Sequence, residues 1–361
     1  MKEQHPALAR AAGFCDAFNL RVPILMAPMA GACPPSLAIA VANAGGLGGC
    51  GALMMEPGAI RAWASEVRAA SNGAFQINLW IPDPPPRRDA AAEAAVRTFL
   101  AQWGPEIADE AGDVTLIDFE AQCEAILDAG PPMISSIMGL YPDRFVQRAK
   151  ERGIKWFATA TTVTEARQAE AAGADAIIAQ GMEAGGHRGA FDASVAETNL
   201  VGLFALLPAI ADAVNIPIIA TGAIADSRGV AAALLLGASA VQVGTGLLRC
   251  PEAHIPAVLA DAIGRTLPEE TLITRAFSGR PARTIATAYA RAATAPDAPS
   301  PAPYPVQRAL TQAMREAALK ANDIDRMQAW AGQSAALAPA QPAGEVVRSL
   351  WDGAQVLLSR A

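Results

Sequence analysis

The amino-acid sequence predicts a parallel (β/α)8 barrel, and three observations lead to this prediction. Short, continuous apolar runs recur along the chain, and such runs are typical of strands buried on both faces of a parallel sheet. Alanine-rich segments with helical spacing separate most of these runs. Two of the resulting βα units also resemble each other in sequence. The runs predicted to be strands are 22–29, 46–52, 75–81, 133–138, 155–161, 176–181, 217–222 and 240–245.

The two similar units are 173–181 (GADAIIAQG) and 237–244 (GASAVQVG), which start 64 residues apart. In each unit a glycine ends a helix and a strand follows, and the offset equals two βα units of roughly 30 residues each. Helices are predicted over 164–172, which opens on a threonine, and over 228–236. An open doubly wound sheet is the alternative to a closed barrel, but no G-x-G-x-x-G follows the first strand.

The predicted barrel covers residues 1–264, and two regions do not follow its repeat. Residues 82–130 begin with Pro-Asp-Pro-Pro-Pro and continue with acidic helical sequence, so we interpret them as an elongated insertion between a strand and its helix. Residues 265–345 begin polar and pass through a linker rich in Pro and Ala, and we expect them to form a cap over one face of the barrel. Residues 346–361 are expected to form a C-terminal helix that packs on the barrel.

Composition and charge exclude several classes of function. The net charge is −7 and no run of Lys or Arg occurs, which argues against a nucleic acid or an anionic membrane as the partner. Five cysteines without a C-x-x-C motif and only three histidines indicate reduced thiols and no metal site. Two uncharged stretches, 22–55 and 229–248, are interrupted by Pro or Gly and do not predict membrane spans. Because the N-terminus is charged where an export signal is apolar, we expect a cytoplasmic protein.

The loops after the seventh and eighth strands are candidates for binding a phosphate, since barrels often bind phosphate there. They read ATGAIAD over 220–226 and QVGTG over 242–246. Gly222 and Gly244 let backbone N–H groups approach an anion, Thr245 adds a hydroxyl group, and a helix N-terminus follows each loop. The alternative is that these glycines only permit the turn from strand to helix.

The loop after the sixth strand, QGMEAGGHRG over 180–189, holds the candidate catalytic residue, His187. An imidazole with an ordinary pKa of about 6.5 takes up or releases a proton near neutral pH, and barrel active sites lie at this end of the strands. Gly185 and Gly186 remove side chains beside it, so a flat ligand can approach. The alternative is a structural histidine bonded to a carbonyl group, but the surrounding glycines favour catalysis.

Two amides, Asn78 and Gln180, lie inside otherwise apolar strands. A buried amide without hydrogen bonds costs on the order of 1–3 kcal/mol, so each must bond either to neighbouring backbone or to a ligand. A flavin ring has an edge of alternating donors and acceptors that amides at the barrel mouth can bond. The first strand ends in a small apolar loop, APMAG over 27–31, that can lie under the face of such a ring. Its alternative is a simple proline turn.

Several of these segments are similar to those of a known family. The chain resembles class I nitronate monooxygenases, formerly called 2-nitropropane dioxygenases, over most of its length and in the family's order. The EAGGHRG segment is the most specific, whereas Gly-Gly-His alone is shared with related flavin barrels. The matching segments are 27–31, 180–189, 220–226, 242–245, 303–307 (PYPVQ) and 330–333 (WAGQ).

The resemblance implies a TIM barrel with a helical cap that holds FMN non-covalently. It implies that His187 is the catalytic base and that Tyr304 is a wall of the substrate pocket. One departure concerns the phosphate turn, where the family usually has two glycines and this chain has Gly222 and Ala223; a positive φ at Ala223 would weaken the hold on the phosphate. The residues expected to contact FMN are Ala27, Pro28, Met29, Asn78, Gln180, Gly185, Gly186, Gly222, Ala223, Gln242, Val243, Gly244 and Thr245.

The function implied by the resemblance is the oxidation of alkyl nitronates by O2 to a carbonyl compound and nitrite. Neutral nitroalkanes would be used after His187 removes a proton. One alternative is an FMN-dependent reductase of enoyl thioesters that consumes NAD(P)H, and another is a barrel without redox chemistry that binds a phosphate-bearing ligand. The expected partners are a nitronate or nitroalkane and O2, and the sequence indicates neither the physiological substrate nor the oligomeric state.

Overall fold

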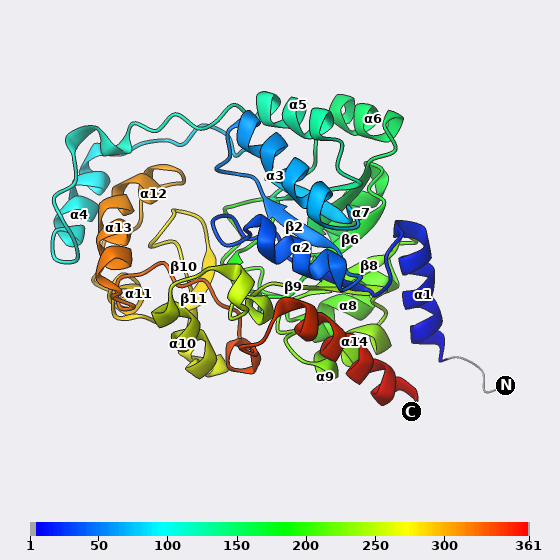
Figure 1. Ribbon diagram of the computed structural model, residues 1–361. Helices are drawn as coiled ribbons and strands as arrows, with labels where there is room; N and C mark the ends of the chain where they lie inside the picture. The colour runs from blue at the N-terminus through cyan, green and yellow to red at the C-terminus, as the bar shows by residue number, and fades with distance from the viewer. Residues whose placement is uncertain (1–4, 360–361) are drawn as a thin grey trace.

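The structure, a computed structural model, describes residues 5–359. Its main sheet has eight parallel strands in the order β1-β9-β8-β6-β5-β4-β3-β2, and a bridge between Leu25 and Leu47 joins the two ends of that order. The strands therefore form a TIM barrel with helices around it (Figure 1). The strands are β1 (Ile24–Met26), β2 (Gly48–Gly51), β3 (Phe75–Trp80), β4 (Met133–Ile137), β5 (Lys155–Ala160), β6 (Ala176–Gln180), β8 (Ile218–Thr221) and β9 (Ala240–Val243).

Every predicted strand segment contains one of these strands, and the predicted fold class is confirmed. The two predicted helices are α7 (Val163–Ala171) and α9 (Ser227–Leu235). Each begins at a side-chain cap, because Thr162 accepts the Glu165 N–H and Asp226 accepts the Gly229 N–H. The other helices around the barrel are α2 (Pro35–Asn43), α3 (Pro57–Ala70), α5 (Phe119–Ala129), α6 (Asp143–Glu151), α8 (Leu203–Ala211) and α14 (Ala343–Ser359).

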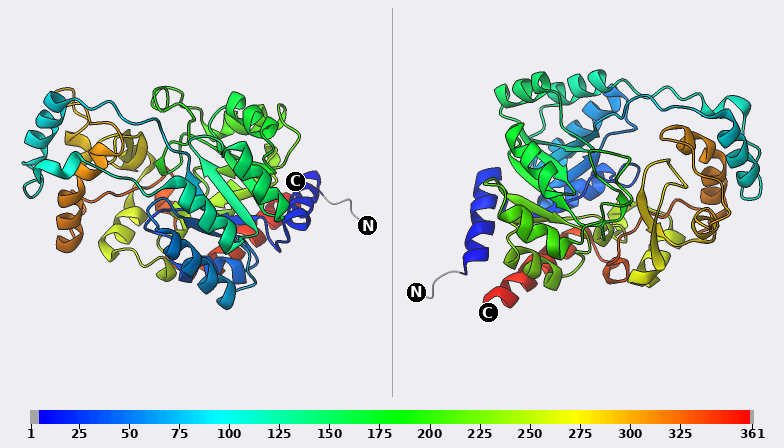
Figure 2. Two further views of the ribbon diagram at one scale, coloured as in Figure 1. Left: turned by 90° about the horizontal axis from the view of Figure 1, so that it is seen from above. Right: turned by 180° about the vertical axis from the view of Figure 1, so that it is seen from behind.

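The amino-terminal end of the barrel is covered by α1 (Pro6–Phe18). Phe18 packs edge-on against Phe157 of β5 with ring centroids 4.9 Å apart, and Phe14 contacts both rings. The C-terminal helix α14 packs on α9, α2 and α1. The opposite end of the molecule carries the cap (Figure 2). One end of the barrel is thus sealed by apolar side chains, which leaves the carboxyl ends of the strands for the site.

The cap contains a small antiparallel sheet that the sequence analysis did not predict. Its strands are ordered β10 (Thr271–Thr274), β11 (Ala282–Ile285) and β7 (Gly186–His187). Strand β7 belongs to the loop after β6, and its His187 pairs with Ala282 of β11. The cap sheet therefore holds the backbone of the candidate catalytic residue. The cap helices are α10 (Ala257–Arg265), α11 (Ala288–Ala292), α12 (Val306–Leu310) and α13 (Gln312–Ala321).

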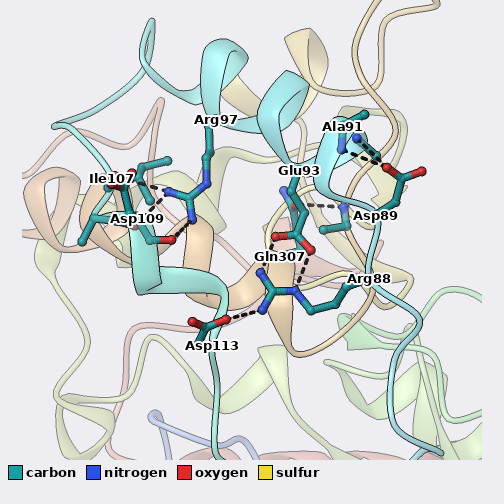
Figure 3. A network of polar contacts seen from close by, with 12 residues as sticks. Arg88, Asp89, Ala91, Glu93, Arg97, Ile107, Asp109, Asp113 and Gln307 are labelled. Carbon is teal, nitrogen blue, oxygen red and sulfur yellow. Dashed lines mark hydrogen bonds and ion pairs between the residues drawn. The ribbon is translucent and has the colours of Figure 1, made fainter.

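Within the segment 82–130, α4 (Ala90–Leu100) lies beside the cap helices and α5 lies on the barrel (Figure 1). Val96 and Leu100 of α4 join the apolar cluster of the cap. Polar contacts hold the chain around α4 together (Figure 3): Arg88 forms ion pairs with Glu93 and Asp113. Arg97 donates hydrogen bonds to the carbonyl groups of residues 107–109. The cap is therefore built from two parts of the chain that are distant in sequence.

Candidate active site

A cavity of about 870 Å³ lies at the carboxyl ends of the barrel strands, beneath the cap. This is where TIM barrels hold their ligands. Val243 is not among the residues that line it, because side chains alternate along β9 and this one is fully buried in the core outside the barrel interior. The residues of the predicted site that do line it are Ala27, Pro28, Met29, Asn78, Gln180, Gly185, Gly186, His187, Gly222, Ala223, Gln242, Gly244, Thr245 and Tyr304.

The side-chain amide of Gln180 is held in one orientation. Its Oε1 accepts hydrogen bonds from Arg188 Nη1 at 3.2 Å and from the Gly189 N–H at 2.8 Å. Its Nε2 donates to the carbonyl oxygen of His187 at 3.1 Å. Both lone pairs of the oxygen are therefore used by the protein, and the amide offers the cavity the remaining N–H of Nε2.

The amides of Gln242 and Asn78 are oriented in the same manner. Gln242 Oε1 accepts from Gln76 Nε2 at 3.0 Å, so its own Nε2 is left for a ligand. Asn78 Nδ2 donates to Ser135 Oγ at 3.1 Å, which leaves Oδ1 as an acceptor. A flavin edge has carbonyl and ring-nitrogen acceptors around a single N–H donor. Two amide donors and one amide acceptor at the barrel mouth fit that edge, so the residues present suit a flavin.

The turn after β8 has two consecutive residues with positive φ, Gly222 at +120° and Ala223 at +52°. The left-handed conformation costs a residue with a Cβ roughly 1–2 kcal/mol, so Ala223 is strained. Next to it, a side chain at Gly244 would meet Ala27 Cβ at 3.4 Å and Met29 Sδ at 3.6 Å. The backbone of both turns faces the cavity, in the manner of phosphate-binding turns, and Ala223 carries the positive φ that the sequence analysis names as unfavourable.

Gly185 is needed for a reason that differs from the one inferred from the sequence. A Cβ at this position would lie 2.5 Å from the Gly332 nitrogen and 2.6 Å from the Ala331 carbonyl carbon. The loop is therefore packed directly against the backbone of the 330–333 segment of the cap. The Gly332 N–H in turn donates to Thr245 Oγ1 at 3.0 Å. Gly186 has φ of +74° and open space where a Cβ would lie, so the predicted approach of a ligand there is not blocked by the protein.

The His187 imidazole is hydrogen-bonded to the cap. Its Nε2 lies 2.8 Å from Ser278 Oγ. The Ser278 hydroxyl also donates to the Arg280 carbonyl oxygen at 3.2 Å and accepts the Arg280 N–H at 3.3 Å. When its hydrogen points to that carbonyl, Ser278 Oγ accepts from His187, and the proton of the neutral imidazole is then on Nε2 with Nδ1 as the free acceptor. In this tautomer the imidazole is set up as a base at Nδ1.

Aromatic side chains surround this imidazole. Its ring centroid lies 4.5 Å from that of Trp80 and 5.2 Å from that of Trp330, both edge-on. Tyr304 lies next to Trp80 at 5.5 Å, and its Oη is buried without a hydrogen bond to any residue of 5–359. The walls beside the candidate base are therefore apolar, with one hydroxyl left for a ligand.

The electrostatic environment favours a neutral imidazole and an anionic ligand. Burial, reinforced by Arg280 and Arg308, lowers the pKa of His187 to about 3. Arg280 is paired with Asp83, whose Oδ2 lies 2.8 Å from its Nη1. Arg308 and Arg315, on α12 and α13, line the cavity and form no ion pair with a carboxylate of the described residues. Burial and Arg308 lower the pKa of Arg315 to about 10, which leaves it charged at neutral pH.

Several residues of this site were missed by the sequence analysis: Trp80, Ser278, Arg308, Arg315 and Trp330. Trp80 carries a usable signal, because it follows Asn78 by two residues in a strand and so shares its face, and Trp330 lies in the WAGQ segment that the resemblance marks. The others come from the cap. Within residues 5–359, no group of three or more His, Cys, Asp or Glu side chains is placed to hold a metal ion. No helix of that same part of the chain is long and apolar enough to cross a membrane.

Comparison with known proteins gives consistent matches. Residues 14–353 match the sequence model of the family described as nitronate monooxygenase. A nitronate monooxygenase of Paraburkholderia phytofirmans is 39% identical and covers 91% of each chain. One of Pseudomonas aeruginosa is 37% identical and covers 93% of this chain and 97% of its own.

Solved structures are similar over the whole fold. A nitroalkane oxidase of Streptomyces ansochromogenes has a TM-score of 0.88 at 35% identity, and the match covers 96% of this chain and 99% of that one. FabK from Thermotoga maritima has a TM-score of 0.75 at 29% identity, and the match covers 96% of this chain and 97% of that one. Both matches include the barrel and the cap.

Proposed function

The chain belongs to the nitronate monooxygenase family, a family of flavin-dependent oxidoreductases, and from this premise we propose that it binds FMN and oxidises alkyl nitronates with O2. The products of this reaction are a carbonyl compound and nitrite. The observation that carries the proposal is a neutral imidazole with a free Nδ1 beside amides that suit a flavin edge. The relatives named nitronate monooxygenase and nitroalkane oxidase support the same chemistry.

The residues that would hold FMN come from five strand ends, those of β1, β3, β6, β8 and β9. The amides of Asn78, Gln180 and Gln242 would bond the ring edge, and the loop 27–31 would lie under the ring face. The turns at 222–223 and 244–245 would hold the phosphate through backbone N–H groups, with a weaker contribution from Ala223 because its φ is positive. Bound there, FMN supplies the redox chemistry by accepting electrons from the substrate and passing them to O2.

The protein's own step is proton transfer at His187. In a neutral nitroalkane the C–H bond next to the nitro group breaks, its proton goes to Nδ1, and the electron pair stays on the substrate as the nitronate anion. An imidazole with a pKa of about 3 holds that proton poorly by itself. The negative charge that forms beside it favours the imidazolium, so proton transfer and charge formation support each other. A preformed nitronate needs no such step.

The cap residues bind the anion and keep water out. Arg308 and Arg315 give the cavity a positive potential without carboxylate partners among the described residues, which favours a nitronate over a neutral ligand. Trp330 of the cap and Trp80 of β3 both pack edge-on against the imidazole. The unpaired Oη of Tyr304 is the hydroxyl that would bond the substrate. Exclusion of water from the cavity by these aromatic side chains would strengthen each electrostatic contact inside the site.

A second candidate function is kept because FabK shares the fold and 29% of the sequence. In that case the chain would be an enoyl-thioester reductase and would take its electrons from NAD(P)H. The two functions are separated by loading the purified protein with FMN and mixing it, without oxygen, with NADH or with a nitronate. The proposal expects the visible flavin absorbance to bleach rapidly with the nitronate and slowly with NADH, and the reverse result favours the reductase. A protein that does not bind FMN at all would indicate a non-redox barrel.

We place the protein in the cytoplasm as part of this proposal. All five cysteines are unpaired and buried, as expected in a reducing compartment. Detoxification of nitroalkanes there is the role that the family suggests. Separation of periplasmic and cytoplasmic fractions, followed by an immunoblot, tests the location.

A further inference from the structure

Arg188 is one of the largest fully buried side chains of the protein, with 1% of its surface exposed. Its Nη1 donates to Gln180 Oε1 at 3.2 Å and to the Gly181 carbonyl oxygen at 2.7 Å. Its Nε and Nη2 make no hydrogen bond within residues 5–359. A buried guanidinium is normally paired with a carboxylate, because burying a charge without a partner is costly.

No carboxylate of the described residues forms an ion pair with this guanidinium. Glu165 and Glu183 are the acidic groups around it, but neither forms an ion pair with it. Glu165 accepts the N–H groups of Thr161 and Phe191, and Glu183 accepts that of Leu203. Burial, with a contribution from Arg283, lowers the pKa of Arg188 to about 10, so the group remains a cation at neutral pH.

The cation lies directly behind a residue of the cavity wall. Gln180 lines the cavity, whereas Arg188 does not, and the two are joined by the Nη1 to Oε1 hydrogen bond. This bond occupies one lone pair of Oε1, and the Gly189 N–H occupies the other. The amide therefore points its N–H toward the cavity. The positive charge at Oε1 draws electron density from the amide and so makes this N–H a stronger donor.

We propose that Arg188 is a positioning residue for the flavin: it fixes the Gln180 amide as a donor to the ring edge and sets a buried positive charge behind it. A hydrogen-bond donor with a positive charge close behind it binds the electron-rich reduced ring more tightly than the oxidised ring. Arg188 therefore raises the reduction potential of the bound flavin. This inference rests on the proposed binding of FMN.

The test uses Arg188→Met, which removes the charge, and Arg188→Lys, which keeps it. FMN affinity is measured by titrating the flavin-free protein, and the reduction potential by equilibration with reference dyes. We expect Arg188→Met to bind reduced FMN about tenfold more weakly relative to oxidised FMN, which lowers the two-electron potential by about 30 mV. Arg188→Lys should recover most of that shift.

Arg283→Met is the matched control. Arg283 is also buried, at 6% exposed, but it donates to the Met182 carbonyl oxygen and to Thr271 Oγ1, not to an amide of the cavity wall. Its loss should lower the melting temperature with a much smaller change in potential. An Arg188→Met protein with the potential of the wild type, or with a shift no larger than that of Arg283→Met, overturns the proposal.

Gln180→Glu keeps the proposal testable if Arg188→Met does not fold. The carboxylate pairs with Arg188, neutralises the buried charge and presents an acceptor in place of a donor. We expect this variant to fold, to bind FMN at least tenfold more weakly and to have a lower potential; wild-type values for both would overturn the proposal. If the wild-type protein itself does not bind FMN, the proposed function fails, and that result is distinct from any difference among the variants.

Discussion

His187 Nε2 and Ser278 Oγ lie 2.8 Å apart although 91 positions separate the two residues in the chain. The bond joins the loop after β6 to a turn of the cap. Because the Ser278 hydroxyl can donate its hydrogen to the Arg280 carbonyl oxygen, it can accept from Nε2, which is the arrangement that puts the imidazole proton on Nε2. The cap therefore engages Nε2 and leaves Nδ1 without a hydrogen bond to any residue of 5–359.

Replacing His187 with Asn should separate two classes of substrate. The variant lacks a base, so turnover of neutral nitroalkanes should fall by about 10²–10⁴-fold, the usual contribution of general base catalysis. Preformed nitronates need no proton removal and should keep most of their rate. Oxygen uptake with both forms of one nitro compound measures the difference. An equal loss on both forms would refute the role of His187 as base.

Replacing Ser278 with Ala should affect the same step more mildly. Without the hydroxyl, Nε2 loses its acceptor and the proton can sit on either nitrogen, so we expect about a tenfold lower kcat/KM with nitroalkanes, less than the loss of the base itself. Ser278→Thr keeps the hydroxyl and should restore the rate. Ser194→Ala, which removes an exposed hydroxyl bonded to Asp192, is the control. A Ser278→Ala enzyme with wild-type kcat/KM would contradict the tautomer assignment.

The lowered pKa of His187 predicts a pH-dependent stability. In the unfolded chain a histidine takes up a proton near pH 6.5, whereas His187 in the folded protein does so only near pH 3. Between these values the unfolded state binds more protons, so the free energy of unfolding of the flavin-free protein falls as the pH falls. Urea unfolding at pH 7 and pH 5 should show a smaller fall for His187→Asn than for the wild type. Parallel falls would show that His187 titrates normally.

The strained turn at Ala223 predicts a stabilising substitution. Ala223→Gly should raise the free energy of unfolding by roughly 0.5–1 kcal/mol, because relief of the left-handed conformation outweighs the added entropy of the unfolded chain. Ala172→Gly is the matched control, since Ala172 also follows regular structure but has φ of −75°. The control should destabilise the protein in the same urea titration. If both substitutions destabilise it, the positive φ at Ala223 is not a source of strain.

The barrel was predictable because each of its strands is a continuous apolar run. A motif in a strand does not place all of its side chains on one side. Side chains alternate along β9, so Gln242 faces the cavity and the Val243 side chain points away from it. Strand β7 could not be predicted, since it has only two residues and exists because β11 of the cap pairs with it.

The cap side of the site was less accessible to sequence analysis. Ser278 and Arg308 have no periodicity or spacing that relates them to His187, and Trp330 is marked only by the resemblance, in the WAGQ segment. Ser278 and Trp330 contact His187 because β11 pairs with β7 and Trp330 forms a bridge with Thr284 of β11, whereas Arg308 acts on it through its charge, from α12. Such contacts depend on how the cap docks on the barrel. The sequence could predict that a cap exists, and the structure was needed to place its residues.

Oxygen consumption by the FMN-loaded protein with a preformed nitronate, in the absence of NADH and with nitrite assayed in the same sample, tests the central claim most directly. The proposed function predicts that oxygen falls at once and that nitrite accumulates as it does. No oxygen uptake with the nitronate, or uptake that starts only when NADH is added, would contradict it.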